Sequence, residues 1–307
     1  MNTKLALSAV GLKVKLGKTQ VLHDVNLAVK TGQVYGLLGR NGAGKTTSLR
    51  CALGFLPFEG GKVEVFGTPA YQLHRVPEQL GVALDPPGMD DTLTVRQNLE
   101  LARIRGGLES GRGVDEALEL VGLTHRSDNA GDRLSHGQSR RAAVARALLG
   151  SPALLLLDEP LSGLDPEGVE VLLGLFRHLA DEEGVTVVLS SHHLREVQHI
   201  CDQVGLIEQG KTILEGEVDS LLKEAGDGLR LACGKPEIAQ NILQETSGIR
   251  ECTPQAEGQF LARLDADVDI PTLLEKLVKG GAEVSEFSRD RATLVDVFHQ
   301  AIQRQSA

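Results

Sequence analysis

Eight consecutive residues have the composition of a loop that wraps a phosphate group. They follow the short apolar strand expected at Gln33–Leu38 and run Gly39-Arg40-Asn41-Gly42-Ala43-Gly44-Lys45-Thr46. The glycines let backbone N–H groups turn inward around a β-phosphate, Lys45 adds a positive charge near the β and γ oxygens, and the Thr46 hydroxyl suits Mg²⁺. The residues expected to contact a nucleotide here are Gly39, Asn41, Gly42, Ala43, Gly44, Lys45, Thr46 and Thr47.

Two consecutive carboxylates, Asp158 and Glu159, follow the apolar run Ala153–Leu157. Such a run is typical of a strand buried on both faces of a parallel sheet, and ligands bind at the carboxyl edge of these sheets. Asp158 suits Mg²⁺, directly or through a water, and Glu159 suits polarising a water that attacks a γ-phosphate. Two solvated loop acids are the alternative, but Pro160 and the complete phosphate loop favour the catalytic interpretation.

The segment Leu134–Gln138, LSHGQ, contains no reactive pair of its own. Ser135 suits the N-cap of a helix whose apolar pattern runs through Leu149. The Ser135 hydroxyl and the Gly137 N–H would also be donors for an anion at this helix N-terminus. Arg140 and Arg141 are slightly unfavourable in the opening turns, so they are either an exposed basic pair or residues that belong to an end facing a nucleotide.

The first two thirds of the chain alternate between strand and helix patterns. Strands are expected at residues 5–15, 25–29, Gln33–Leu38, Ala153–Leu157 and Val185–Leu189, and helices at Thr46–Leu53, Val114–Val121, Ser135–Leu149 and from Pro166 onward. A helical insertion is expected at residues 87–130, where Thr94 and Gln97 form a capping box. This alternation predicts an α/β domain with a mostly parallel sheet.

From about residue 225 the pattern changes to short strands and helices in the order βαββαβ, followed by a last helix. The strands are expected at Leu229–Cys233, Ile249–Cys252, Gln259–Leu264 and Glu283–Phe287, and the helices from Pro236, at Pro271–Lys279 and at Thr293–Ile302. This order predicts a small ferredoxin-like module. It contains no nucleotide or metal motif, so we interpret residues 223–307 as a regulatory or dimerising module and residues 1–222 as the nucleotide-binding domain.

Charge and composition exclude several classes of protein. A formal charge of -10 and the lack of clustered Lys and Arg argue against a nucleic-acid partner. No segment approaches the roughly 20 apolar residues that cross a bilayer, so the chain is not expected to be an integral membrane protein. Four widely spaced cysteines have neither a metal-ligand nor a redox spacing, which is typical of reduced thiols in a cytosolic protein.

Taken in order, the phosphate loop, LSHGQSRRAAVARALL, LLLLDEP, SGLD and SSH resemble the ATP-binding cassette (ABC) ATPases over residues 3 to about 220. The usual signature of that family is Leu-Ser-Gly-Gly-Gln. The resemblance implies a P-loop NTPase core of ABC type, α/β, with an antiparallel β subdomain and a helical insertion, plus the small α+β C-terminal module. It also implies ATP and Mg²⁺ as ligands, and a homodimer that pairs head to tail.

The resemblance assigns roles to particular residues. In the family, each signature helix points at the ATP held by the partner subunit, which assigns Ser135, Gly137 and Gln138 to nucleotide binding. Asp165, in the SGLD segment, resembles the loop that communicates between the two sites. His192 resembles the switch histidine that contacts the γ-phosphate and steadies the catalytic Glu159.

The sequence departs from the family at three positions. Leu16 stands where an aromatic ring usually packs under the adenine, so it offers no π-stacking. Asp85 stands where a glutamine usually reaches Mg²⁺ or the attacking water. Its carboxylate would serve the metal through a water, or repel the γ-phosphate and slow turnover. His136 replaces a signature glycine at a helix start that does not require one.

The resemblance predicts the ATP-hydrolysing subunit of an ABC transporter that acts on a separate transmembrane permease, docked around Asp85–Asn98. The tail, Thr293–Phe298, is similar to the C-terminal module of bacterial exporter subunits, which favours export. Such a chain is expected to be cytoplasmic and peripheral on the inner face of the cell membrane. The alternatives are a soluble ABC ATPase not coupled to transport and a weakly hydrolysing, nucleotide-dependent regulator.

Overall fold

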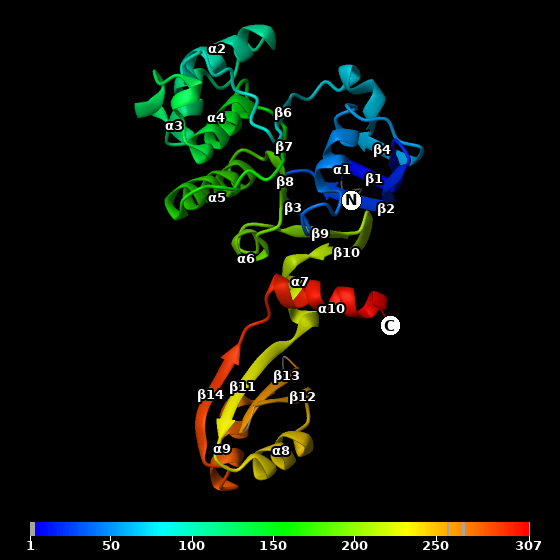
Figure 1. Cartoon of the computed structure of the whole chain (residues 1–307), viewed down its shortest axis with the longest axis vertical. Helices are drawn as coiled ribbons and strands as arrows, with labels where there is room; N and C mark the ends of the chain where they lie inside the picture. The colour runs from blue at the N-terminus through cyan, green and yellow to red at the C-terminus, as the bar shows by residue number, and fades with distance from the viewer. Residues whose placement is uncertain (1–3, 257, 266–267, 307) are drawn as a thin grey trace. The chain divides into compact units, whose positions relative to one another are not determined.

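The computed structural model describes residues 4–256, 258–265 and 268–306 of the 307-residue chain. The chain divides into two compact units, Met1–Glu217 and Val218–Ala307 (Figure 1). The boundary predicted after residue 222 falls inside helix α7 (Val218–Ala225), which belongs to the second unit. This helix was not predicted from the sequence, and its buried residues Val218, Leu221 and Ala225 give it one apolar face.

The first unit is built on a ten-stranded sheet in the order β5-β4-β1-β2-β10-β9-β3-β8-β7-β6. Strands β1, β2, β4 and β5 pair antiparallel, whereas β6, β7, β8, β3 and β9 pair parallel. The strands are β1 Leu5–Leu16, β2 Thr19–Lys30, β3 Val34–Leu38, β4 Gly60–Val65, β5 Thr68–Pro69, β6 Leu80–Ala83, β7 Leu154–Leu157, β8 Thr186–Ser191, β9 Gln203–Glu208 and β10 Lys211–Glu217.

Strand β2 is much longer than the strand predicted at residues 25–29. It begins at Thr19, which pairs with Leu16 of β1 across a two-residue connection. Gly17 has a φ of 60°, a conformation that suits glycine in such a tight turn. The first half of β2 lacks a clean alternation of buried and exposed residues, so its sequence pattern alone does not indicate a strand.

The helices of the first unit fall into two groups. Helix α1 (Lys45–Ala52) follows β3, and α5 (Pro166–Asp181) and the short α6 (Leu194–Val197) follow β7 and β8. Helices α2 (Val95–Arg105), α3 (Val114–Leu120) and α4 (His136–Leu148) pack on one another (Figure 1). Short 3₁₀ turns η1, η2 and η3 occupy Ala70–Arg75, Thr124–Arg126 and Gly131–Arg133. None of the helices in the described ranges combines the length and apolar character needed to cross a bilayer.

The central strands bring the predicted site residues to one edge of the sheet. Every residue of β3, β7 and β8 is buried, as expected for parallel strands covered on both faces. Leu38 of β3 is in register with Ser191 of β8, and Leu157 of β7 with Leu189 of β8. The segments that follow β3, β7 and β8 therefore leave the sheet side by side at its carboxyl edge, where ligands of such sheets bind.

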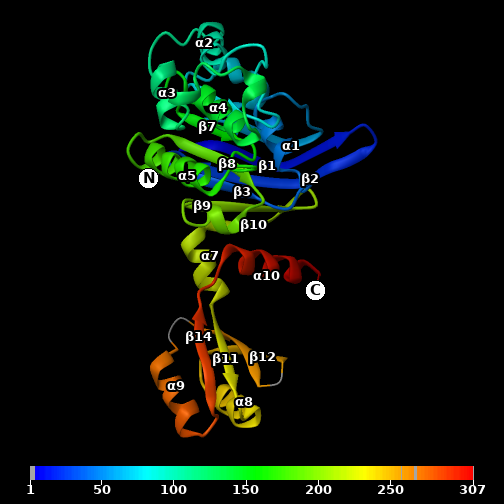
Figure 2. The same cartoon turned by 60° about the vertical axis from the view of Figure 1, so that its left-hand side comes forward.

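The second unit has the predicted element order. Its antiparallel sheet runs β12-β13-β11-β14, and the chain order is β11-α8-β12-β13-α9-β14. Helix α8 packs beside β12, α9 packs beside β14, and α10 packs on α7 (Figure 2). The bounds are β11 Asp227–Cys233, α8 Pro236–Glu245, β12 Ile249–Ala256, β13 Gln259–Leu264, α9 Ile270–Lys279, β14 Val284–Asp290 and α10 Leu294–Ser306.

Candidate active site

The loop between β3 and α1 has the backbone of a phosphate cradle. Gly42 and Gly44 have φ angles of 81° and 114°, which residues with a side chain avoid. A Cβ added at Gly44 would lie 2.4 Å from Cδ2 of Leu22, whereas one at Gly42 would meet nothing within 4 Å. Helix α1 begins directly at Lys45, so its first unpaired N–H groups and its positive end adjoin this loop.

Strand β3, which carries the loop, is fixed by a hydrogen bond between the buried Tyr35 and the partly buried Glu215. The Tyr35 hydroxyl donates to Oε1 of Glu215 on β10 at 2.7 Å, and the same oxygen accepts the N–H of Ala28 on β2 at 2.7 Å. Burial raises the pKa of Tyr35 well above its ordinary value, and the nearby Glu215 carboxylate acts in the same direction. Tyr35 therefore remains a neutral donor that joins three strands.

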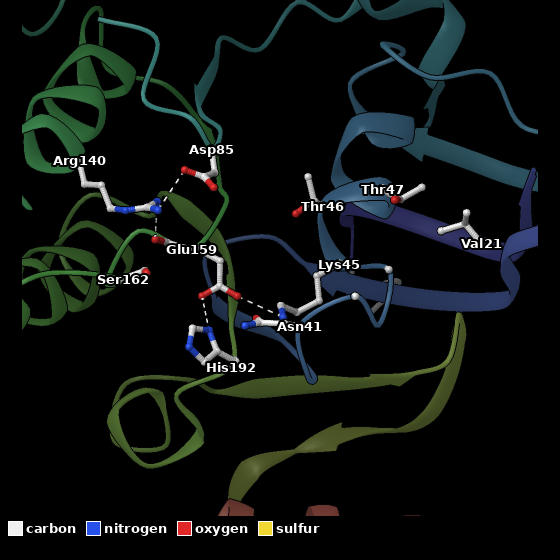
Figure 3. A pocket seen from close by; sticks show the side chains of 12 residues that line it. Val21, Asn41, Lys45, Thr46, Thr47, Asp85, Arg140, Glu159, Ser162 and His192 are labelled. Atoms are coloured by element: carbon white, nitrogen blue, oxygen red, sulfur yellow. Dashed lines mark hydrogen bonds and ion pairs between the residues drawn. The ribbon is translucent and has the colours of Figure 1, made fainter. Parts of the chain in front are cut away.

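Lys45 lies at the centre of the cavity beside the loop. Its side chain is 5% exposed, and its ammonium donates to the carbonyl oxygens of Gly39 at 2.8 Å and Arg40 at 3.3 Å. The same ammonium forms an ion pair with Oε1 of Glu159 at 3.1 Å (Figure 3). A positive charge is thus held where the predicted β and γ phosphates would lie, with a carboxylate as its partner.

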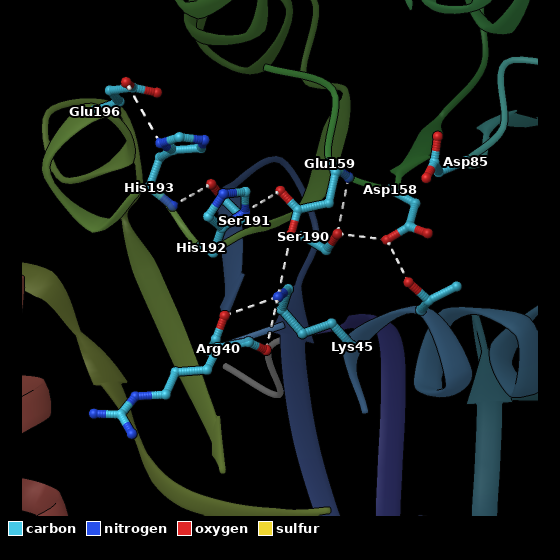
Figure 4. A network of polar contacts seen from close by, with 12 residues as sticks. Arg40, Lys45, Asp85, Asp158, Glu159, Ser190, Ser191, His192, His193 and Glu196 are labelled. Atoms are coloured by element: carbon cyan, nitrogen blue, oxygen red, sulfur yellow. Dashed lines mark hydrogen bonds and ion pairs between the residues drawn. The ribbon is translucent and has the colours of Figure 1, made fainter. Parts of the chain in front are cut away.

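Thr46 and Asp158 lie together, as expected for two residues that hold one cation. The Thr46 hydroxyl donates to Oδ1 of Asp158 at 3.0 Å, and the Ser190 hydroxyl donates to the same oxygen at 2.6 Å (Figure 4). Within the described ranges, Oδ2 of Asp158 is buried and has no hydrogen-bond partner. A buried carboxylate oxygen beside a threonine hydroxyl is a donor set that Mg²⁺ accepts, so these residues fit the predicted metal.

Glu159 and His192 are in direct contact. Nδ1 of His192 lies 2.8 Å from Oε2 of Glu159, and the Glu159 side chain is 16% exposed (Figure 4). The Glu159 backbone has a φ of 49°, in the left-handed region, and its N–H donates to the Ser190 hydroxyl at 2.9 Å. The carboxylate is therefore aimed into the cavity and contacted by a histidine on one side and by Lys45 on the other.

Asp85 and Arg140 form an ion pair across the cavity wall. Nη2 of Arg140 lies 3.0 Å from Oδ1 of Asp85, and Nη1 of Arg140 donates to the Glu159 carbonyl oxygen at 3.0 Å (Figure 3). Arg140 is buried, and Arg141 donates to the carbonyl oxygen of Val121. The expectation of an exposed basic pair is therefore wrong, because each guanidinium is turned toward acceptors of its own subunit.

The signature residues serve the local structure of α4. The Ser135 hydroxyl accepts the N–H of Gln138 at 3.2 Å, while the Gln138 side chain accepts the N–H of Ser135 at 3.1 Å, so the two form a capping box. A Cβ on Gly137 would lie 2.9 Å from the carbonyl oxygen of Gly163. Asp165 caps α5 by accepting the N–H of Gly168 at 3.0 Å.

A cavity of about 450 Å³ joins the two sides of the site. Its lining contains nine of the predicted site residues, namely Asn41, Gly42, Gly44, Lys45, Thr46, Thr47, Asp85, Glu159 and His192. It does not contain Leu16, Ser135, Gly137, Gln138 or Asp165 within the described part of the chain. Leu16 is 44% exposed at the end of β1.

Three residues around the cavity were not predicted from the sequence. Val21 and Ser162 line it, and Ser190 links Asp158 to the backbone of Glu159. Ser162 and Ser190 each stand in a motif that was recognised, SGLD and SSH, so their positions were a usable signal. No sequence motif marks Val21, because the pairing of β1 with β2 brings it to the cavity.

Comparisons with known proteins agree with this geometry. The sequence profile of a family described as "ABC transporter" matches residues 22–162. The bacitracin transport ATP-binding protein BcrA of Bacillus licheniformis is 33% identical over 93% of this chain and 94% of that protein. The Nod factor export ATP-binding protein I of Rhizobium sp. (strain N33) is 34% identical over 96% of both chains. A solved ATP-binding subunit of an ABC transporter is 26% identical, with a TM-score of 0.64, over 71% of this chain and 92% of that one.

The phosphate loop, the paired carboxylates and the parallel strands define a P-loop nucleotide-binding protein. With relatives above 30% identity along nearly the whole chain, the chain belongs to the ABC transporter family as an ATP-binding subunit, an ATPase. The resemblance drawn from the motifs is therefore confirmed, as is the fold class.

Proposed function

We propose that this chain is the ATP-hydrolysing subunit of an exporter, acting as a head-to-tail homodimer on a separate transmembrane subunit. The similarity to BcrA and to the Nod factor export protein spans both units of the chain, which supports an export system rather than a shared ATPase core alone. This partner would hold the chain at the inner face of the cell membrane. The permease would dock around Asp85–Asn98, beside the cavity.

Hydrolysis is supported above all by the position of Glu159. Its carboxylate contacts His192 and Lys45 inside the cavity, where it would accept a proton from a water attacking the γ-phosphate. His192 would keep Oε2 oriented, and Lys45 would leave Oε1 to meet the phosphate oxygens. Thr46 and Asp158 would hold Mg²⁺, which supplies positive charge to the phosphates when bound.

The nucleotide base is proposed to lie over the β1–β2 hairpin. Val21 of this hairpin lines the cavity, and Leu16 is exposed at the end of the neighbouring strand. Both are aliphatic, so the base would gain apolar contact but no aromatic stacking. Base selectivity between ATP and GTP is therefore expected to be weak.

The homodimer is supported by the location of the signature segment. Within the described ranges, none of Leu134–Gln138 lines the cavity of its own subunit. The Ser135 hydroxyl accepts one capping hydrogen bond, which leaves its own O–H available to donate. We propose that Ser135, Gly137 and Gln138 contact ATP bound to the partner subunit, and that Asp165 lies at the same interface.

Mixed dimers test the shared site. Glu159→Gln removes the base and Ser135→Ala removes the signature hydroxyl, so a dimer of the two variants would carry one site with both changes and one intact site. We expect mixing to restore up to about half of the wild-type turnover per mixed dimer, measured by phosphate release. A mixture no more active than the average of the separate variants would contradict the shared site.

Thr94→Ala provides the matched control for Ser135→Ala. Thr94 caps α2 with Gln97 in the same capping-box geometry, and Thr94 is not part of the cavity lining. Both substitutions remove an equivalent cap, but in the purified chain, without the permease that would dock near Thr94, only Ser135→Ala should lower turnover. Equal losses of turnover in the two variants would indicate that Ser135 acts only as a helix cap and does not contact ATP.

The membrane partner is tested by purification from detergent-solubilised membranes. An affinity-tagged Glu159→Gln chain, loaded with ATP, is expected to bring down an integral membrane protein from the organism that encodes the chain. Recovery of the chain only from the supernatant, together with phosphate release by the wild-type chain well above that of Glu159→Gln, would favour the soluble ATPase. Recovery with the membrane protein but with turnover no faster than that of Glu159→Gln would favour the weakly hydrolysing regulator.

A further inference from the structure

We propose that Arg140 is a positioning residue of the ATPase site, which holds the backbone of Glu159 and at the same time neutralises Asp85. The inference rests on the hydrolytic role proposed for Glu159. It gives Asp85 the role of a counter-ion to Arg140, in place of the metal ligand or the phosphate-repelling group that the sequence left open.

The guanidinium of Arg140 joins three segments of the chain. Nε lies 3.3 Å from Nε2 of His136 in the preceding turn of α4. Nη1 donates to the Glu159 carbonyl, and Nη2 pairs with Asp85 (Figure 3). The Arg140 side chain is 7% exposed. A planar group with partners on three sides and little access to water has one preferred orientation, so it can fix the positions of its neighbours.

Glu159 needs such support because its backbone is strained. A residue with a side chain in the left-handed region costs about 1–2 kcal/mol, and such residues persist only where their surroundings hold them. Here the Glu159 N–H donates to the Ser190 hydroxyl, while its carbonyl accepts from Arg140 at 3.0 Å and from the Ser162 N–H at 3.2 Å. Both peptide groups of Glu159 are therefore anchored, and Arg140 supplies a side-chain hydrogen bond on the carbonyl side.

Asp85 needs a counter-ion because of where it lies. Its side chain is 48% exposed and lines the same cavity as Lys45 and Thr46. An unpaired carboxylate at this wall would repel the triphosphate, as two like charges do at short range. The 3.0 Å contact with Arg140 offsets this charge. Thr46 and Asp158 bond to each other in the structure, while the carboxylate of Asp85 turns to Arg140 (Figure 3).

The two effects separate in a double-mutant cycle of Arg140→Gln and Asp85→Gln. Arg140→Gln should lower kcat about tenfold to a hundredfold, because a displaced Glu159 loses its alignment. The same change should raise the KM for ATP about threefold to tenfold, because Asp85 becomes unpaired. In the double variant the KM should return toward the wild-type value, while kcat stays low, because no group replaces the guanidinium on the Glu159 carbonyl.

Binding of the fluorescent analogue MANT-ATP in the same four proteins tests the counter-ion role without hydrolysis. Arg140→Gln should weaken binding, and Asp85→Gln should restore it in the Arg140→Gln background. If Arg140→Gln weakened MANT-ATP binding equally in the wild-type and the Asp85→Gln backgrounds, the proposal would be overturned. A wild-type chain that binds MANT-ATP but never hydrolyses ATP would refute the proposed function, while this binding cycle would still decide the pairing of Asp85 with Arg140.

Two further variants separate positioning from general stability. Arg146 lies on the same helix, and its guanidinium donates to two backbone carbonyl oxygens, those of Gly88 at 2.6 Å and Pro87 at 2.8 Å. Any change that Arg146→Gln causes in the KM for ATP should be the same in the wild-type and the Asp85→Gln backgrounds. Arg140→Lys keeps the charge but loses the planar fork, so it should keep the KM near the wild-type value while lowering kcat. If Arg140→Lys kept both the melting temperature and the kcat of the wild-type chain, the positioning role would be contradicted.

Discussion

The two sides of the cavity are built in different ways. On one side, the phosphate loop and the start of α1 come from one continuous segment, and the Lys45 ammonium contacts the carbonyl of Gly39 only six residues away. On the other side, Glu159 contacts His192 at a separation of 33 residues, and Arg140 contacts Asp85 at a separation of 55. The first side is determined by local backbone conformation, whereas the second exists only once the sheet and α4 are packed.

This difference predicts distinct consequences of substitution. Changes on the loop side should affect nucleotide binding, because its groups are already in place in the local chain. Changes on the assembled side should affect turnover or the packing of α4, because its groups depend on one another. Arg140→Gln should in addition weaken nucleotide binding, because it leaves the Asp85 carboxylate unpaired at the cavity.

The largest effect is expected from Glu159→Gln on the assembled side. Loss of the base should lower kcat about 10²–10⁴-fold while ATP binding is retained, since the amide keeps the shape but cannot accept the proton. Steady-state phosphate release and MANT-ATP titration measure the two quantities. Glu182→Gln, at the exposed end of α5, is the control and should leave both unchanged.

Lys45→Ala should have the next largest effect, this time on binding. Removal of a charge that faces the phosphates should weaken ATP binding about a hundredfold, in line with the loss of one partner from a buried charged contact. The control is Lys62→Ala, whose side chain is 67% exposed and paired with Glu64. Equal ATP affinity in the Lys45 and Lys62 variants would refute the assignment of the phosphate loop.

A smaller effect is expected from Gly137→Ala, which tests the packing of α4. The added Cβ would lie 2.9 Å from the Gly163 carbonyl oxygen, so the loop or the helix must shift, at a cost of about 1–3 kcal/mol in unfolding free energy. Gly174→Ala in α5 is the matched helical control, because a Cβ there meets nothing within 4 Å. It should stabilise the chain by about 0.5–1 kcal/mol. Urea unfolding of both variants gives the sign of each change.

The smallest effect is expected from the two capping boxes. Ser135→Ala and Thr94→Ala should each lower the unfolding free energy by about 1 kcal/mol, because each removes one hydroxyl that accepts an N3 amide. Denaturant midpoints measured side by side compare them. A much larger loss of stability for Ser135→Ala would indicate that this hydroxyl makes further contacts within its own subunit.

Features that depend on residues close together along the chain could be predicted from the amino-acid sequence. The strand, glycine loop and helix from Val34 to Ala52 were predictable because turn, charge and helix start lie within one short segment. The capping boxes at Thr94 and Ser135 are likewise properties of four consecutive residues. The burial of β7 and β8 followed from their unbroken apolar runs, which placed Asp158, Glu159 and His192 at the same sheet edge.

Contacts between groups far apart in the sequence could not be predicted and became known from the packed fold. Nothing near Arg140 in the sequence indicates that its guanidinium pairs with Asp85 and with the carbonyl of Glu159. The extension of β2 to Thr19 depends on its pairing with β1, and the entry of Val21 into the cavity depends on the resulting hairpin. The physical reason is that a charged side chain is satisfied by whichever partners packing brings within about 3 Å, and sequence patterns record the neighbours along the chain, not those across the fold.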